Sequence, residues 1–131
     1  MSAFTVFDGS RRRIVFNDAN PAGRQRSDLC HEIAHGLLLH EPVPAFDGSG
    51  LRDWDQVMED EAQFMAGALL LTETAIVAAT RRGDPVEWTA RTFGVSIEMA
   101  RWRANVTGAQ KRALRERAKR TRNRAASPVG R

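Results

Sequence analysis

The chain is poor in cysteine and in long apolar runs, and both shortages restrict what it can be. Cys30 is the single cysteine among 131 residues, so no internal disulfide can form, and we interpret it as a packed core thiol. No stretch approaches the roughly 20 apolar residues that span a bilayer, and residues 1–13 lack the apolar core of a signal peptide. We therefore expect one cytoplasmic domain without membrane contact, long enough to bury a hydrophobic core.

Acidic residues are scarce near the C-terminus, although the whole chain has a net charge of only +4. Residues 111–131 hold nine of the twenty basic residues and one acid, Glu116, which gives +8. The other 110 residues hold eleven basic and fifteen acidic residues, which gives −4. A basic tail of this kind is typical of contact with nucleic acid or an acidic partner, and equally of a solvated helix end with a disordered terminus.

The hydrophobic pattern predicts a hairpin followed by helices, an α+β fold that is mostly α. Residues 4–7 and 13–17 read as two strands joined by a turn at 8–10. Caps, breakers and periodicity then predict helices over about 21–40, 53–71, 72–83, 84–94, 96–105 and 109–122, with a disordered end at 125–131. Gly23 weakens the first helix, which can therefore begin nearer Ser27.

One short motif carries the chemistry: His31-Glu32-Ile33-Ala34-His35, an H-E-x-x-H sequence within the first helix. Residues four apart on a helix lie on one face, about 40° apart around the axis, so both imidazoles can bind one metal ion. Glu32 projects beside them, where it can act on a water molecule. The pattern is typical of zinc metallopeptidases, and it predicts His31 and His35 as ligands of Zn²⁺ and Glu32 as the catalytic glutamate.

A catalytic zinc takes a third protein ligand, and spacing alone leaves several acids open. His40 lies about 140° from His35 on a continuing helix, so it points off the metal face unless the helix ends before it. Glu61 shares a face with apolar residues of the second helix, where a carboxylate needs a partner. Glu59 and Asp60 lie nearby and remain alternatives.

The chain also has no tyrosine, a residue that many zinc peptidases use to stabilise the tetrahedral oxyanion. A donor besides the metal must then be His40, an arginine such as Arg24 or Arg26, or a backbone N–H; otherwise zinc acts alone.

Longer segments resemble the ImmA/IrrE family of zinc metallopeptidases. RQRSDLCHEIAHGLLLH followed by EDEAQFMAGALLLT is similar to the family's HELGHLLLH and EEEANRFAAELLMP helices, in the same order and at similar spacing. The hairpin ending in RIVFN and the downstream RTFGVSIEMARWR are similar too, so the resemblance covers residues 4–108. Gln63 and Thr72 stand where the family usually has Asn and Pro.

The resemblance implies metal ligands at His31, His35 and Glu61, catalysis by Glu32, and a small zincin-like fold of the short stand-alone type. It also implies that the substrate is a partner XRE-type helix-turn-helix repressor, in a mobile element or a stress response. We expect three regions: a metallopeptidase core at 1–83, a helix-turn-helix-like pair packed on it at 84–108, and a basic helix with a disordered tail at 109–131.

Two other functions stay open from the residues alone. Residues 84–107 have a helix-turn-helix pattern with Arg101 and Arg103 on the second helix, so that 84–124 could form a DNA-binding or adaptor module. The apolar residues of that segment also fit a packed core: Trp88, Phe93, Val95, Ile97, Ala100 and Trp102. The other reading is a pseudoenzyme that binds the repressor without cutting it.

Overall fold

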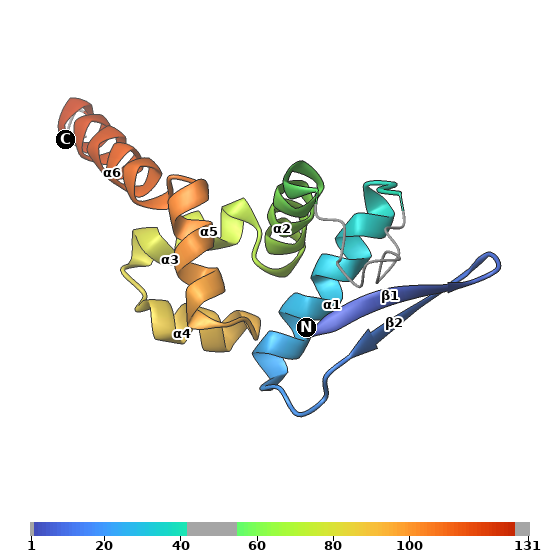
Figure 1. The fold of residues 1–131 in the computed structure, drawn as a ribbon. Helices are drawn as coiled ribbons and strands as arrows, with labels where there is room; N and C mark the ends of the chain where they lie inside the picture. The colour runs from blue at the N-terminus through green and yellow to red at the C-terminus, as the bar shows by residue number, and fades with distance from the viewer. Residues whose placement is uncertain (1, 42–54, 128–131) are drawn as a thin grey trace.

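The computed structural model describes residues 2–41 and 55–127, which form one hairpin and six helices (Figure 1). In chain order the elements are β1 (Ala3–Asp8), β2 (Arg11–Phe16), α1 (Ala22–Leu37), α2 (Gln56–Leu70), α3 (Glu73–Arg82), α4 (Val86–Phe93), α5 (Ile97–Val106) and α6 (Ala109–Ala126). The predicted α+β class, mostly helical with an N-terminal hairpin, is confirmed.

Two predicted segments, 41–50 and 125–131, lie partly outside the described residues. Nearly all of the expected loop at 41–50 lies outside the described residues. The last helix continues to Ala126, so the predicted end near 122 is wrong, and so is the disorder expected at 125 and 126; residues 128–131 are not described.

The hairpin packs one of its faces against α1. Its strands are antiparallel, with Thr5 opposite Ile14 and Phe7 opposite Arg12, so these four side chains share a face because cross-strand partners do. Helix α1 lies between the hairpin and α2 (Figure 1). The H-E-x-x-H helix is therefore covered from two sides.

The contact between α1 and α2 is made by small residues. Ala34 of α1 meets Ala62 and Ala66 of α2, and all three are fully buried. Short side chains let the two helix backbones approach closely, which brings the polar groups on either side of the contact into reach of each other. Cys30 packs at the edge of this cluster, where burial raises the pKa of its thiol.

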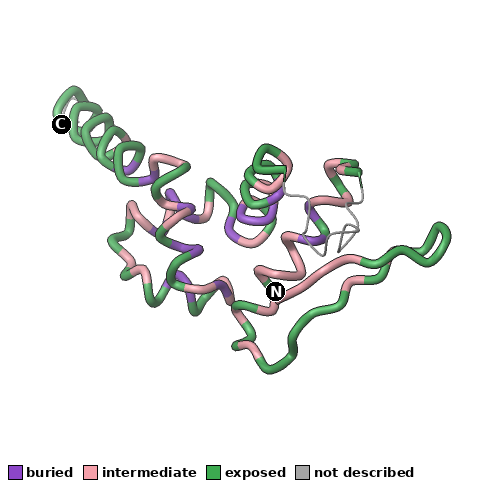
Figure 2. The backbone as a smooth tube through the Cα atoms, viewed as in Figure 1, coloured by how far each residue is buried: buried purple, intermediate pink, exposed green. Residues whose placement is uncertain are grey.

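A second and larger core joins α3, α4, α5 and the start of α6 (Figure 2). Val95 and Ala100 are buried there, as expected, whereas Trp88 and Ile97 are 45% and 36% exposed, so their assignment to the core is wrong. Arg103 is only 2% exposed, and its Nε donates to the carbonyl of Leu71 at the end of α2.

The first turns of α1 meet the turn between α4 and α5. At Gly23 an added Cβ would stand 3.2 Å from the Val95 carbonyl carbon, so glycine permits this close approach. Arg26 donates to the carbonyl of Gly94 across the same contact. The helix therefore begins at Ala22 despite Gly23, and this packing compensates for the weak helix propensity of glycine.

No single helix among residues 2–41 and 55–127 is long and apolar enough to cross a membrane; only α2 and α3 taken together, bent by 60°, reach that length and composition.

Candidate metal centre

The two histidines of the motif point to one spot beside α2. The Nε2 atoms of His31 and His35 lie 3.1 Å apart, which follows from their spacing of one helical turn on α1. Both rings are partly buried. Burial, and secondly the neighbouring His31, lowers the pKa of His35 and favours the neutral ring that binds a metal ion.

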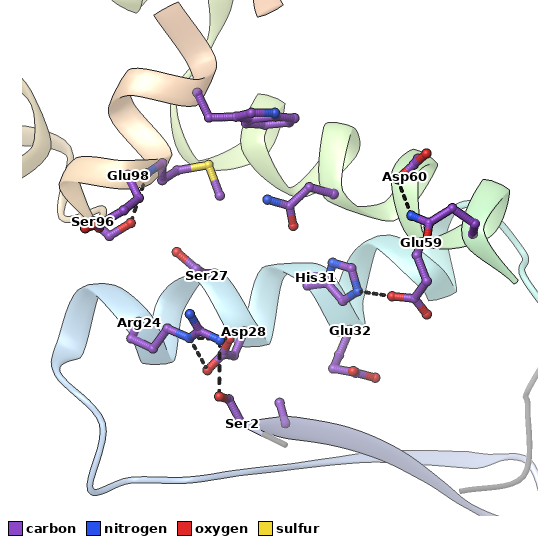
Figure 3. Close-up of a pocket in the computed structure, with 15 residues that line it drawn as sticks. Ser2, Arg24, Ser27, Asp28, His31, Glu32, Glu59, Asp60, Ser96 and Glu98 are labelled. Carbon is purple, nitrogen blue, oxygen red and sulfur yellow. Dashed lines mark hydrogen bonds and ion pairs between the residues drawn. The ribbon is translucent and has the colours of Figure 1, made fainter. Parts of the chain in front are cut away.

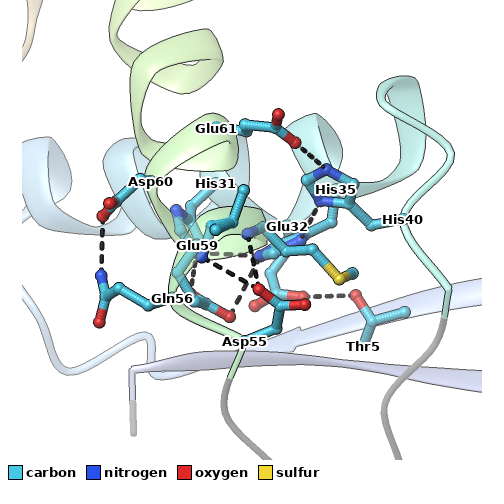
Figure 4. Close-up of polar contacts among 12 residues, drawn as sticks. Thr5, His31, Glu32, His35, His40, Asp55, Gln56, Glu59, Asp60 and Glu61 are labelled. Carbon is cyan, nitrogen blue, oxygen red and sulfur yellow. Dashed lines mark hydrogen bonds and ion pairs between the residues drawn. The ribbon is translucent and has the colours of Figure 1, made fainter.

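Glu59 of α2 completes this group. Its Oε2 lies 3.0 Å from Nε2 of His31, and its Oε1 lies 3.6 Å from Nε2 of His35 (Figure 4). Within the described part of the chain, these three residues are the group able to hold a metal ion. Asp55 sets the start of α2 by accepting hydrogen bonds from the backbone N–H of Val57 and Met58, which places Glu59 one turn into the helix.

The structure does not bring Glu61, the expected third ligand, to the two motif histidines. Its side chain is 58% exposed, and its Oε2 lies 3.0 Å from Nε2 of His40. Residues two apart on a helix lie about 200° apart, so Glu59 and Glu61 cannot both face α1. The face that does so is marked by Ala62 and Ala66, with Glu59 in line. The group that the structure gathers is therefore His31, His35 and Glu59, whereas Glu61 lies apart from it.

The donor atoms fit a zinc ion. Ligands about 2.0–2.1 Å from zinc, at tetrahedral angles, are about 3.3 Å from one another. The two Nε2 atoms lie 3.1 Å apart, and the Glu59 carboxylate approaches each with a different oxygen, Oε2 at 3.0 Å from His31 and Oε1 at 3.6 Å from His35. Two imidazole nitrogens and one carboxylate are also the donor set of many catalytic zinc sites, which leave the fourth position open.

Glu32 lies next to the histidines with its carboxylate toward β1. It is 6% exposed, and its Oε2 accepts a hydrogen bond of 2.5 Å from the Thr5 hydroxyl. Arg12 reaches over α1 from the same face of the hairpin and donates both to the Glu32 carbonyl and to the Thr5 hydroxyl. Gly36 leaves the room that the Arg12 guanidinium occupies.

Sequence reasoning missed Thr5 and Arg12. The available signal was the strand alternation, because a register that pairs Phe7 with Arg12 puts Thr5 and Arg12 on the same face. Without knowing that this face packs on α1, no pattern in the sequence connects them with Glu32.

A groove of about 590 Å³ runs from the metal centre along α1 (Figure 3). Its walls come from the start of β1, from α2 and from the first turns of α5. Arg24 and Asp28 line it on α1 and form an ion pair of 3.0 Å, and Met99 and Trp102 add apolar surface.

The three side chains expected as possible oxyanion donors, Arg24, Arg26 and His40, lie in three different places. Arg24 lies in the groove two turns from His31, where it also bonds Ser2. Arg26 bonds the carbonyl of Gly94 on the α4–α5 turn, and His40 lies behind His35. Of the three, Arg24 is the one that lines the groove.

A hairpin packed on an H-E-x-x-H helix, with a carboxylate from the next helix at the two imidazoles, defines the zincin class of metallopeptidase domain. Residues 1–105 match the profile of a peptidase family described as the IrrE N-terminal-like domain. The chain belongs to this family, the ImmA/IrrE family, as the resemblance implied.

One curated relative is the radiation response metalloprotease IrrE of Deinococcus radiodurans, which is 33% identical over 86 residues. The match covers 61% of this chain and 25% of the relative, so the chain corresponds to about a quarter of that protein. No solved structure matches the chain.

Proposed function

We propose that this chain is a zinc-dependent endopeptidase in which His31, His35 and Glu59 hold Zn²⁺ and Glu32 is the general base. The observation that carries the proposal is the convergence of two imidazole nitrogens and a carboxylate at separations of 3.0 to 3.6 Å, beside a buried glutamate. Family membership supports the metallopeptidase class.

Zinc would supply a Lewis acid that polarises the scissile carbonyl and acidifies a water molecule. Glu32 would take the proton of that water and pass it to the departing amine. Thr5 holds one carboxylate oxygen of Glu32, Oε2, so we assign Oε1 to the proton transfer. The hydrogen bond from Thr5 fixes the Glu32 carboxylate in place before a substrate arrives, which lowers the cost of reaching the reactive geometry.

The substrate would lie in the groove beside α1. Ser2 and Ala3 at the start of β1 line this groove, and β1 pairs only with β2 among the described residues. An extended peptide could therefore add to β1 as a third strand, with its backbone held by strand hydrogen bonds and its side chains over the groove.

We further propose that the protein cut is a partner helix-turn-helix repressor of the XRE type, in a mobile element or a stress response. This follows from the resemblance to the family, and the name of the Deinococcus relative, a radiation response metalloprotease, is consistent with a stress response. An endopeptidase suits such a role because one cut between two regions of a repressor is irreversible.

The test is co-expression with a helix-turn-helix repressor encoded beside this chain. The wild type should produce discrete repressor fragments, whereas Glu32→Gln should bind one equivalent of zinc and produce none, because the amide cannot take up the proton. Zinc content by elemental analysis and fragments by mass spectrometry are measured on the same samples. Cleavage by Glu32→Gln at the wild-type rate contradicts the mechanism.

The same samples separate the two alternatives. A pseudoenzyme would copurify with the intact repressor whether or not Glu32 is present. A DNA-binding module built on residues 84–107 is disfavoured by the burial of Arg103, which cannot reach a duplex from the core. A metal-free protein that binds DNA would favour that module instead.

The basic surface of α6 supports a nucleic-acid contact as an accessory to cleavage. From Arg117 to Ser127 every residue is exposed, and the helix extends away from the rest of the molecule (Figures 1 and 2). It also lies outside residues 1–105, the part that matches the family profile. Such a helix could hold the peptidase near a DNA-bound repressor by phosphate contacts.

A further inference from the structure

His40 lies directly behind the ligand His35. The Nδ1 atoms of the two rings are 2.9 Å apart, on the side of His35 away from the Nε2 atom that faces the metal centre (Figure 4). The His40 side chain is only 8% exposed, and its Nε2 in turn lies 3.0 Å from Oε2 of Glu61. The three groups form a continuous chain from the carboxylate to the ligand.

The end of α1 creates this arrangement. The helix stops at Leu37, and Leu39 has a φ of +56°, a left-handed conformation that is unfavourable for leucine. The backbone N–H of His40 then bonds the carbonyl of His35, so His40 turns back instead of continuing the helix. Leu39 is 87% exposed and its side chain gains little from packing. The turn is held by the backbone bonds of Leu39 to Gly36 and of His40 to His35, together with the side-chain contacts of His40.

If His35 binds a metal ion through Nε2, the positions of the ring protons on His35 and His40 follow. If Nε2 of His35 binds a metal ion, its ring is neutral and carries its proton on Nδ1. That N–H can donate to His40 only if Nδ1 of His40 has no proton. His40 must then carry its proton on Nε2, the atom that faces the Glu61 carboxylate.

We propose that His40 and Glu61 are positioning residues that fix the ring orientation and tautomer of His35. The inference rests on the zinc site proposed above and explains why Glu61 stands near the site without reaching it. Outer partners of this kind orient a ligand and raise its basicity. His40 has the larger role because it is buried, whereas water can partly replace the exposed Glu61 carboxylate.

The experiment measures the zinc affinity of the purified full chain by competition with a chromophoric chelator. His40→Leu should weaken zinc binding about 10–100-fold, the range found when outer partners are removed. His40→Asn should recover most of the affinity, since an amide oxygen near the Nδ1 position can still accept from His35. Glu61→Gln should change the affinity by a few-fold only, because its amide oxygen can accept from His40.

Circular dichroism and urea unfolding of each variant separate loss of the site from loss of the fold. If His40→Leu does not fold, the test is the comparison of His40→Asn with Glu61→Ala. Of these two variants, Glu61→Ala should bind zinc more weakly. Zinc affinity in a folded His40→Leu within twofold of the wild type overturns the proposal. So does a greater loss in Glu61→Gln than in Glu59→Gln, which would make Glu61 a direct ligand.

These outcomes do not depend on cleavage. If the wild type binds zinc with the expected dependence on His40 but cuts no repressor, the peptidase proposal fails and this one stands. If the protein binds zinc and cuts the repressor, but substitution of His40 does not change the zinc affinity, only the positioning role fails.

Discussion

At the scale of single residues, the site depends on which side chains receive a hydrogen bond before any substrate binds. The buried Glu32 carboxylate is a costly group to desolvate, and the Thr5 hydroxyl offsets part of that cost from the neighbouring strand. Arg12, on the other strand of the hairpin, joins β2 to the same helix by donating to the Glu32 carbonyl. The hairpin thus positions Glu32, the proposed general base, although the motif that points to this residue is local.

Thr5→Val tests this coupling. The variant keeps the shape of the side chain but loses the hydroxyl, so the free energy of unfolding should fall by about 1.5–3 kcal/mol, the range for a hydrogen bond to a charged group. Urea unfolding with the same excess of zinc for both proteins measures it. Thr5→Ser should retain most of the stability, and an equal decrease in both variants would show that the hydroxyl bond is not responsible.

Glu59 and Glu61 give the sharpest comparison on one helix. Glu59→Gln should lower zinc affinity by more than the roughly 10–100-fold typical of outer partners, because it replaces the charged carboxylate of a proposed ligand with a neutral amide. Glu61→Gln should remain within a few-fold of the wild type. Elemental analysis after dialysis, followed by chelator competition, ranks the two; the reverse ranking would restore Glu61 as the ligand.

At the scale of elements, helix α2 shows why an apolar pattern can indicate the wrong face. Its largest apolar side chains are not its most buried: Phe64 and Leu69 are 53% and 49% exposed, whereas Ala62 and Ala66 are fully buried. If the face with the largest apolar side chains packed on α1, Glu61 would lie toward α1. The face that does pack on α1 carries the small residues and places Glu59 there. The interface with α1 favours small residues because the two helices lie close together.

Gly67 likewise permits a close approach, on the side of α2 that faces α5. A Cβ there would overlap the Trp102 ring and approach the Arg103 side chain, so Gly67→Ala should push the two helices apart. We expect a decrease of about 1–3 kcal/mol in unfolding free energy from overpacking, which exceeds the gain of up to ~1 kcal/mol in helix propensity.

Chemical denaturation measures this decrease, and Gly83→Asn is the matched control. Gly83 ends α3 in a left-handed conformation with nothing within 4 Å of an added Cβ. Asparagine tolerates that conformation better than other residues with a side chain. Gly83→Asn should therefore lower the free energy of unfolding by less than Gly67→Ala does. A stabilised Gly67→Ala would show that α5 can move away at no cost.

At the scale of the whole molecule, charge is divided between an acidic-leaning body and a basic α6. Helix α6 is tied to the body near its start by the ion pairs of Arg112 with Glu73 and of Glu116 with Arg81. Beyond them, basic side chains face solvent on all sides. An exposed helix that carries mostly one sign of charge attracts partners of the opposite charge, and nucleic acid is such a partner.

Reversing three charges tests the proposed interaction with nucleic acid. Arg115, Lys119 and Arg122 share one face of α6, and no ion pair among the described residues involves them. Replacing all three with Glu should weaken binding to an unrelated DNA duplex. It should also flatten the slope of log affinity against log salt by up to about 2.7, because each phosphate that the helix no longer neutralises lowers the slope by about 0.9.

Fluorescence anisotropy at several salt concentrations measures the slope, with zinc content as the control for the intact site. Wild-type protein that does not bind the duplex at low salt, or a slope unchanged by the three substitutions, would contradict the interaction.

The sequence by itself determined the order and type of the elements, although not where each helix ends. It placed His31 and His35 on one helical face, set Glu32 beside them, and predicted the hairpin and each helix, because periodicity, caps and turns are local properties. Only the tertiary structure decided that Glu59 and not Glu61 meets the histidines, that His40 turns back to His35, and that Thr5 holds Glu32. Those outcomes depend on the rotation of α2 against α1, on the packing of the hairpin on α1, and on the left-handed turn at Leu39. The first two are long-range contacts, which no local pattern specifies.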